Sequence, residues 1–381
     1  MNLLRFLSLM VLARVARLAA AEAVLPDGLY AEFTTPRGVI TAELHYTRAP
    51  LMCANFTGLA EGTLAPKDSK PFYSGLTWYR VVPGFVLQSG NPGLKDTDDE
   101  KEPIPHHFPD EFALGLRHDA AGVLSMANAG PDTNSCEFFV TLAPQPRLDY
   151  LHSVFGRVVR GLGVLPQIKA DDTVAIKILR LGAAARAFRA DAAEFARLSA
   201  AAKKFPAARE PGPTAHFDDP DGLIPTTPPR AKAFNAKLAN LERATGLRFF
   251  ARLRAKSPTK AEDAQPGVFM RTLAAQFGTE EKGLLAVYFA DEDDWRVWIG
   301  NDLTPRFAGK AGTVKELTDS EAIHTVKEAF LQAAQATGNA DFKRQQETRA
   351  AAGESAPAPG QRIKLQTDAV IDGLIEKFRT K

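Results

Sequence analysis

Short, largely apolar segments broken by glycine and proline run through the first half of the chain, from residue 28 to about residue 182, and predict β-strands. Residues 30–34 and 39–44 are two such segments on either side of Pro36-Arg37-Gly38, which predicts a β-hairpin. Residues 49–60 instead place apolar side chains three to four positions apart before Gly62, which predicts a helix. Further strands are expected at residues 76–82, 85–88, 122–126, 138–142, 153–159 and 173–181. Many short strands with few helices predict a closed barrel or a sandwich.

The pattern changes after residue 182. Residues 183–205 are rich in alanine and space Phe188, Phe195 and Leu198 for one face of an amphipathic helix. Residues 210–229 contain repeated prolines, which predict an extended segment. We therefore expect a linker over residues 183–230, between a domain at residues 24–182 and another at residues 231–381.

Helical and strand periods alternate in the second domain. Phe234, Leu238 and Leu241 share a helical face that ends at Gly246, and residues 283–290 are a continuous apolar run of the kind that a central strand shows. This alternation predicts an α/β layer domain. Its other expected elements are a strand at 247–253, a helix ending before Gly278, a hairpin over 291–299, helices from Asp319 or Ser320 to about Thr337 and over 367–378, and a flexible insertion at 350–361.

Bulk composition narrows the classes of partner. The 381 residues are 45% hydrophobic and 24% charged, as in ordinary globular protein, and 47 basic residues against 45 acidic ones give a net charge of +2. A net charge this small creates no strong positive electrostatic potential to attract nucleic acid. We therefore expect peptide or small-molecule partners and no nucleic-acid partner. Cys53 and Cys136 lie far apart without metal-ligand spacing, so both are expected to be free, buried thiols.

The first 23 residues predict a secretory signal peptide. A basic start at residues 1–5, an apolar run at 6–13 and small residues at 19–23 follow the order of such signals, which implies export to the periplasm or the exterior. Arg14 and Arg17 interrupt the apolar part, and an amphipathic cytoplasmic extension is the alternative. No later apolar run reaches the roughly 18 residues that a bilayer span requires, so no integral membrane span is expected in the mature chain.

Three short segments carry the candidate chemistry: residues 78–88, 124–130 and 137–139. They place one arginine, Arg80, and two amides, Gln88 and Asn128, among aromatic residues on strand-like segments. No serine-histidine, cysteine-histidine or metal-ligand set adjoins them in sequence. We therefore expect non-covalent chemistry with no cofactor and no metal.

These segments resemble the cyclophilins, which are peptidyl-prolyl cis-trans isomerases. The resemblance covers residues 28–182 and rests on Trp78 to Gln88, Phe-Pro-Asp-Glu-Phe at 108–112, the run at 118–134, Glu-Phe-Phe at 137–139 and Val-Phe-Gly at 154–156. It implies an eight-stranded antiparallel barrel closed by two helices, with a groove on its outer face. It also implies an enzyme that assists folding by rotating X-Pro bonds in proline-containing polypeptide clients.

The resemblance also assigns roles to individual residues. Rotation about an X-Pro bond is slow because its nitrogen is conjugated with the carbonyl, which makes a barrier of ~18–20 kcal/mol. The cyclophilin pattern implies that Arg80 donates to the proline nitrogen in the twisted state and that His152 positions the substrate without transferring a proton. It further implies a proline pocket of Phe85, Phe139 and Leu148 with Val86 at its edge, backbone-binding amides at Gln88 and Asn128, and space for the peptide at Ala127 and Ala129.

Two substrate-binding positions depart from the pattern. Glu137 stands where many cyclophilins have glutamine, and Arg147 stands where many have tryptophan. If Glu137 faces Arg80, its carboxylate can orient the guanidinium but also occupy its hydrogen-bonding capacity. Arg147 replaces an aromatic wall with a flexible cation and favours acidic residues near proline. We therefore expect activity that is reduced but not absent.

Several alternatives remain open. The altered groove could make a proline-peptide-binding scaffold of low activity. The second domain resembles the TPM-domain family over residues 231–305, through the runs at 241–246, 283–290 and 296–301, and could hold the principal activity with the first domain as its targeting arm. His106-His107 and the acidic turn at 291–294 could bind a metal, but a solvated loop and a solvated turn are the preferred interpretations.

Overall fold

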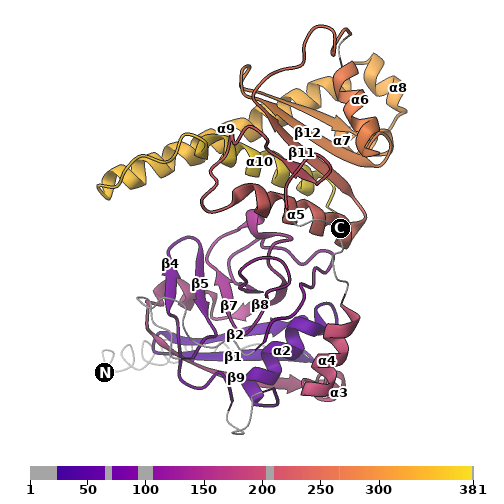
Figure 1. Ribbon diagram of the computed structural model, residues 1–381. Coiled ribbons are helices and arrows are strands. Elements are labelled where there is room, and N and C mark those ends of the chain that lie inside the picture. Colours follow the sequence, from indigo (N-terminus) through magenta and orange to yellow (C-terminus); the bar gives the residue numbers. More distant parts are fainter. Residues whose placement is uncertain (1–23, 65–70, 93–105, 203–209, 266, 380–381) are drawn as a thin grey trace, which may run out of the picture.

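The computed structural model describes residues 24–64, 71–92, 106–202, 210–265 and 267–379. The predicted signal peptide lies outside these ranges. A curled β-sheet forms an N-terminal unit, and an α/β structure forms a C-terminal unit stacked on one end of it (Figure 1). Within the described ranges, no helix is both long and apolar enough to cross a membrane.

The N-terminal unit is built on one antiparallel sheet. Its nine described strand segments have the order β3-β9-β1-β2-β8-β6-β7-β5-β4. The predicted hairpin and each predicted strand region correspond to segments of this sheet. The segments are β1 (Gly28–Thr35), β2 (Gly38–Leu44), β3 (Leu76–Thr77), β4 (Arg80–Val82), β5 (Val86–Ser89), β6 (Val123–Met126), β7 (Phe138–Thr141), β8 (Val154–Arg160) and β9 (Thr173–Leu181).

The concave side of this sheet holds an aromatic core. Phe33 and Phe138 pack there against Phe56 of α2 (Pro50–Glu61), and Trp78 packs against Phe33 and Phe138, with ring centroids 5.2–6.3 Å apart. Helix α2 ends where predicted, because Gly62 adopts the left-handed conformation (φ 82°) that glycine tolerates best. Cys53 and Cys136 are buried free thiols, as predicted.

The segment expected to be a linker is largely structured. In place of one helix, α3 (Gly182–Ala187) and α4 (Ala192–Ala201) are separated at Asp191, whose side chain accepts from two backbone N–H groups and caps α4. Phe195 and Leu198 pack on the N-terminal core. Further along, Phe217 lies in β10 (Phe217–Asp218) within the C-terminal core. The proline pattern predicted an extended backbone but could not show that it joins a sheet.

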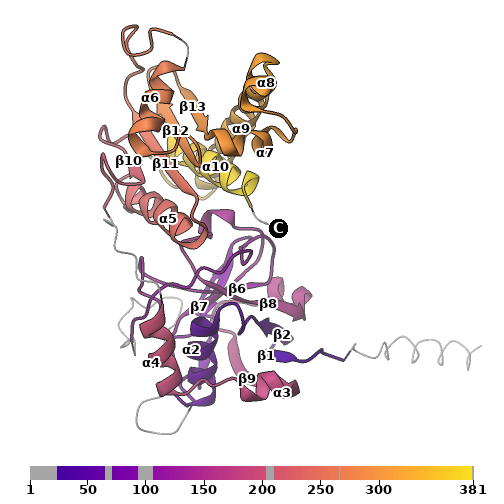
Figure 2. The ribbon, with the colours of Figure 1, turned by 90° about the vertical axis from the view of Figure 1, so that its right-hand side faces the viewer.

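The C-terminal unit has the predicted α/β layers. Its sheet has the order β10-β11-β12-β13, in which only the β12–β13 pair is antiparallel. Helix α6 (Val268–Phe277) packs on one face, and α5 (Arg230–Thr245) and α10 (Gln361–Lys377) cover the other (Figure 2). The remaining strands are β11 (Arg248–Arg254), β12 (Gly283–Phe289) and β13 (Asp294–Ile299).

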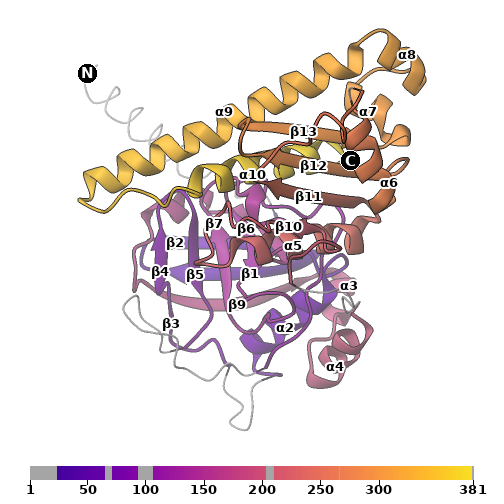
Figure 3. The same ribbon diagram turned by 45° about the horizontal axis from the view of Figure 1, so that its top comes forward.

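The last helices differ from expectation in their bounds. Helix α9 (Ala322–Ala351) continues far beyond Thr337 and lies along α10, crossing the unit as a long rod (Figure 3). Alanine, glutamine and charged residues from 338 to 351 suit a helix but carry no apolar stripe, so periodicity alone did not extend it. The connecting elements are η3 (Asn301–Leu303), α7 (Thr304–Ala308) and α8 (Val314–Asp319).

One face of α5 joins the two units. The Lys237 ammonium donates to the Pro146 carbonyl at 3.0 Å, the Asn240 amide to the Tyr150 carbonyl at 2.8 Å, and the Arg243 guanidinium to the Asp110 carbonyl at 2.7 Å. These donors recur every third residue, so they share one side of the helix. Pro146 begins η1 (Pro146–Leu148), which also touches α10. The C-terminal unit is therefore held against the loops that carry the predicted site.

Candidate functional site

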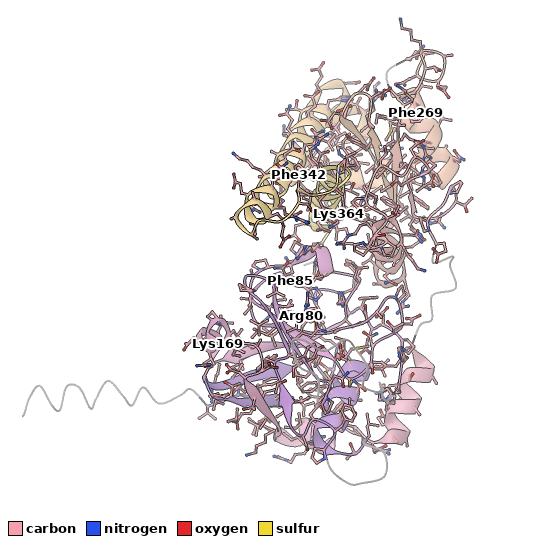
Figure 4. All side chains as sticks on the ribbon, turned by 60° about the vertical axis from the view of Figure 1, so that its left-hand side comes forward. Arg80, Phe85, Lys169, Phe269, Phe342 and Lys364 are labelled. Atoms are coloured by element: carbon pink, nitrogen blue, oxygen red, sulfur yellow. The ribbon has the colours of Figure 1, made fainter. Side chains whose placement is uncertain are left out.

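A row of side chains crosses four strands on the convex face of the N-terminal sheet. Arg80 on β4 lies opposite Gln88 on β5, Gln88 opposite Phe139 on β7, and Phe139 opposite Ser125 on β6. Their strand neighbours Leu87, Phe138 and Leu124 belong to the core, so the alternation of a strand points the row outward. Arg80 and Phe85 lie at the end of the sheet nearest the C-terminal unit (Figure 4).

Hydrogen bonds connect Arg80 to Glu137 through Gln88. Nη1 of Arg80 donates to Oε1 of Gln88 at 3.0 Å, and Nε2 of Gln88 donates to the Tyr79 hydroxyl at 2.7 Å and to Oε2 of Glu137 at 3.1 Å. The other Glu137 oxygen accepts from the Asn91 amide at 3.2 Å. An ionised carboxylate only accepts, so Glu137 turns the NH₂ of Gln88 toward itself and the carbonyl oxygen toward Arg80. Glu137 therefore does not bond Arg80 directly, the contact expected from the sequence if the two residues faced each other. It acts on Arg80 through Gln88.

The predicted proline pocket combines a loop, two strands and a 3₁₀ turn. Phe85 follows Gly84 at the tip of the β4–β5 hairpin and is half-buried, as is Leu148 in η1. Phe139 and Val86 are 4% and 2% exposed. The ring of Phe139 stacks on His118 at 5.7 Å and meets the His152 ring edge-on at 5.4 Å. The aromatic wall is therefore held in place by two histidines.

Arg147 partly restores the wall that the missing aromatic would form. Its side chain is exposed, and its guanidinium carbon lies 4.4 Å from the centroid of the Phe85 ring. The Arg80 guanidinium is 5.8 Å from the same ring. A cation over an aromatic face is attracted to the ring quadrupole, so Arg147 covers one side of Phe85.

The Ala127–Ala129 segment borders the other side of the site. The Asn128 amide donates to the Leu151 carbonyl at 2.8 Å and accepts from the Gly130 N–H at 3.3 Å. The Ala127 N–H is bonded to the Glu137 carbonyl, and Ala129 is exposed. Asn128 therefore positions the loop that carries His152, and substrate binding by these residues stays a prediction.

His152 is held in its neutral form. Its Nδ1 lies 3.0 Å from the Met126 carbonyl oxygen, which fixes the proton on Nδ1 and leaves Nε2 as an acceptor. Burial, with the neighbouring His118, lowers the pKa of His152 to about 4. These features suit a positioning residue better than a general base.

The isomerisation rate should therefore not depend on protonation of His152 near neutral pH. His152 is neutral well above its pKa of about 4, and twisting of the bond transfers no proton. We expect kcat/KM to stay flat from about pH 5.5 to 8, measured by exchange spectroscopy on a proline peptide. A sigmoidal change centred near pH 6.5 would show that an imidazole takes part in the reaction.

A buried serine-histidine-aspartate array, which no motif in the sequence indicated, lies behind Phe139. His118 lies between Ser125, whose Oγ is 3.0 Å from Nε2, and Asp149, whose Oδ1 is 2.9 Å from Nδ1. Nε of Arg117 donates to the other Asp149 oxygen at 2.8 Å. Ser125 and His118 are 0% exposed, so no substrate reaches the hydroxyl, and the array supports the Phe139 ring from behind. The segment before β6 and the residue after η1 meet here, since the His118 backbone N–H also donates to Asp149 at 2.8 Å.

The two segments considered as metal sites, His106-His107 and the acidic turn at 291–294, contain side chains that bond to other protein groups. Nε2 of His106 lies 2.7 Å from the Asn55 side-chain oxygen, and its ring packs against Phe195 at 4.9 Å. In the acidic turn, Asp291 accepts from Ser257, and Asp293 accepts from the Tyr288 hydroxyl and the Arg362 guanidinium. Neither position joins the groove.

Comparisons with known proteins agree with this geometry. The family model described as cyclophilin type peptidyl-prolyl cis-trans isomerase/CLD matches residues 30–182. A peptidyl-prolyl cis-trans isomerase of Schizosaccharomyces pombe, ppi1, is 45% identical over 139 residues, which are 35% of this chain and 80% of that protein. The Arabidopsis thaliana enzyme CYP18-2 is 39% identical over 150 residues, which are 39% of this chain and 86% of that protein.

The chain belongs to the cyclophilin family. Its relatives at about 40% identity are named as isomerases, and the function is accordingly that of a peptidyl-prolyl cis-trans isomerase. A crystal structure of a Cryptosporidium parvum cyclophilin is 25% identical, with a TM-score of 0.34 over 40% of this chain and 98% of that one. The cyclophilin match ends at residue 182, so the C-terminal unit is an addition to the part of the chain that these relatives share.

Proposed function

We propose that this cyclophilin isomerises X-Pro bonds with Arg80 as the hydrogen-bond donor to the proline nitrogen. The observation that carries the proposal is the row in which Arg80, Gln88 and Phe139 are cross-strand neighbours beside Phe85. The aromatic side chains hold the proline ring, and the guanidinium lies at the edge of the same surface. Arg80 is exposed and bonded to a neutral amide, so it keeps donors for a substrate.

The chemistry requires geometry and electrostatics alone. In the twisted state the nitrogen loses its conjugation and gains a localised lone pair, which a guanidinium N–H stabilises. The planar ground state has no such lone pair, so the interaction favours the transition state. No covalent bond is made or broken, and each ~1.36 kcal/mol of this preference raises the rate tenfold.

Exchange spectroscopy on the full chain tests the proposal against a binding-only scaffold. A peptide with one X-Pro bond gives separate cis and trans NMR signals, and catalysis produces exchange between them at substoichiometric protein. Arg147 covering Phe85 favours the scaffold, since a ligand has to displace it or bind beside it. Peptide-dependent shifts in the protein spectrum without exchange would select the scaffold.

We expect Glu137→Gln to raise kcat/KM by about two- to fivefold. The Glu137 carboxylate, linked to Arg80 through Gln88, offsets part of the positive charge that stabilises the proline nitrogen. A glutamine at 137 still offers a carbonyl oxygen to Gln88, so the amide orientation is retained. The measurement is the same exchange assay.

Asp172→Asn is the matched control for that change. It removes one negative charge from a surface carboxylate that pairs with Arg37 outside the site, and it should leave the rate unchanged. A lower rate for Glu137→Gln would mean that the fixed orientation of Gln88 matters more than the charge.

We further propose that the curled sheet is the closed eight-stranded barrel of the family. Residues 76–82 pair with β9 through β3 and with β5 through β4, so one chain segment joins both edges of the sheet. Counted as one strand, β3 and β4 bring nine segments to eight. The expected pair of closing helices is represented by α2 and by the 3₁₀ helix η2 (Leu162–Gln167), whose Leu165 enters the core.

Export of the protein also remains a proposal, supported by the basic and apolar residues at positions 1–13. Mass spectrometry of the mature amino terminus tests it, since cleavage near residue 23 is expected for an exported form. We also propose that the C-terminal unit localises the enzyme or binds clients, which its hydrogen bonds to the loops of the site support.

A further inference from the structure

A cavity of about 400 Å³ adjoins the proline site where the two units meet. On the N-terminal side it is lined by Asn128, Ala129 and His152, which belong to the predicted substrate-binding set. On the other side it is lined by Pro228 to Arg230 and by α5. His152 also touches Phe139, so the cavity begins next to the proline pocket. Its volume lies in the range of ligand pockets.

The C-terminal wall of this cavity is fixed in place. Ala233, Ala236 and Asn240 line it at helical spacing, on the face of α5 that also carries Lys237. Asn240 and Lys237 are 3% and 2% exposed, and both donate to carbonyls of the N-terminal unit. The wall is therefore part of a bonded interface beside the groove.

The cavity is apolar with a basic rim. Its small and cyclic side chains include Ala129, Pro228 and Ala233, and its charged lining residues are Arg230 and Lys232. Lys232 pairs with Glu210. Among the residues that the structure describes, no ion pair includes Arg230, and no carboxylate lines this cavity. A bound acidic side chain would meet an arginine with no competing partner in the lining.

The opposite side of the proline site lacks this excess of basic over acidic lining residues. A second cavity of about 1,260 Å³ lies between the Gly84 and Arg147 side of the groove and helices α9 and α10. Its carboxylates outnumber its basic side chains, and they are Asp119, Asp341, Glu354, Asp368, Asp372 and Glu376. Four arginines also line it, Arg147, Arg344, Arg349 and Arg379, so an acidic residue there would meet a lining of mixed charge in which the carboxylates exceed the arginines. The two sides of the proline site therefore differ in the charge that they accept.

We infer that the C-terminal unit completes a substrate subsite in the 400 Å³ cavity. The subsite takes the segment on one side of the substrate proline and favours an acidic residue there. It rests on the proposed role of the proline pocket, since the subsite is defined by its position beside that pocket. The selected clients are extended polypeptides with an asymmetric acidic flank.

Fluorescence anisotropy of labelled ten-residue peptides on the full chain tests the inference. Each peptide has one central proline, with glutamate or glutamine placed before it or after it. We expect glutamate in one placement only to tighten binding by about two- to fivefold, the range of a partly exposed ion pair. This gain should shrink as salt is raised.

Two variants locate the effect. Arg230→Gln should abolish the glutamate preference, and Ala233→Trp, which fills the cavity from α5, should weaken the ten-residue peptides more than a four-residue peptide. Ala336→Trp is the control, because Ala336 is exposed on α9 and lines neither cavity. A glutamate gain in both placements, in neither, or surviving in Arg230→Gln would overturn the inference.

Measuring both peptide binding and catalysed exchange separates the proposed subsite from the proposed isomerase mechanism. A one-sided glutamate preference that depends on Arg230, without catalysed exchange, would support the subsite and refute the proposed isomerase mechanism. Catalysed exchange with no one-sided preference would do the reverse.

Discussion

Arg80→Ala should lower kcat/KM for a proline peptide by about 10²- to 10³-fold, the usual loss when one preorganised transition-state donor is removed. Arg80 is the cation that the β4–β5 register places beside Gln88, at the edge of the Phe85 ring. The loss should appear in kcat, because the lone pair that accepts the hydrogen bond exists only in the twisted state. Exchange spectroscopy at saturating peptide measures it directly.

Two matched substitutions are the controls for Arg80→Ala. Arg80→Lys keeps the charge but loses the planar fork of donors, so it should recover only part of the rate. Arg37→Ala removes another partly exposed arginine, paired with Asp172 away from the groove, and should leave the rate intact. If Arg80→Ala kept the rate within about threefold of the native protein, the donor would lie elsewhere.

Asp149→Ala should destabilise the N-terminal unit by about 3–5 kcal/mol, the cost of removing one partner of a buried ion pair and leaving Arg117 only the more distant and exposed Glu376 carboxylate, at 3.5 Å. The Asp149 carboxylate accepts from the Arg117 guanidinium, the His118 backbone N–H and the His118 ring, at 2.8, 2.8 and 2.9 Å. Both side chains of the Arg117 pair are nearly buried, 6% and 5% exposed. Urea unfolding followed by circular dichroism measures the loss.

The same substitution has a defined pH dependence. Burial raises the pKa of Asp149, but the His118 hydrogen bond and the charges of Arg117 and Lys237 outweigh it and lower the pKa below its ordinary 3.8. A lowered carboxyl pKa stabilises the fold above the unfolded value and loses that contribution as pH falls through the folded value. The difference between native and variant protein should thus be full above pH 3.8 and shrink below it.

Asp172→Ala and a double variant are the controls for stability. Asp172 forms a more exposed ion pair with Arg37, so its loss should cost at most about 1 kcal/mol. Combining Asp149→Ala with Arg117→Ala should cost less than the two single changes added together, because the unpaired charge is then absent. Strict additivity would show that Asp149 acts by packing instead.

The apolar segments of the sequence predicted most strands of the N-terminal unit. They did so because a strand that packs on a core needs apolar side chains on its buried face. The outward placement of Arg80 and Gln88 follows from the alternation of side chains along a strand and from the core positions of Val81 and Leu87. The site residues themselves came from resemblance to cyclophilins, since an exposed arginine beside a half-buried phenylalanine has no distinctive period. In the C-terminal unit, apolar stripes predicted α5 and α6, whereas the polar end of α9 had no such signal.

The sequence by itself determined the strand segments that build the sheet, the helices that end at glycines, and the motif that carries Arg80, Phe85 and Gln88. Only the tertiary structure decided that Glu137 reaches Arg80 through Gln88, and that α5 walls the groove. The reason is physical: local periodicity records which face of an element is buried. Contacts between residues that lie 49 to 133 positions apart depend instead on strand register and on the docking of two units, which no local pattern encodes.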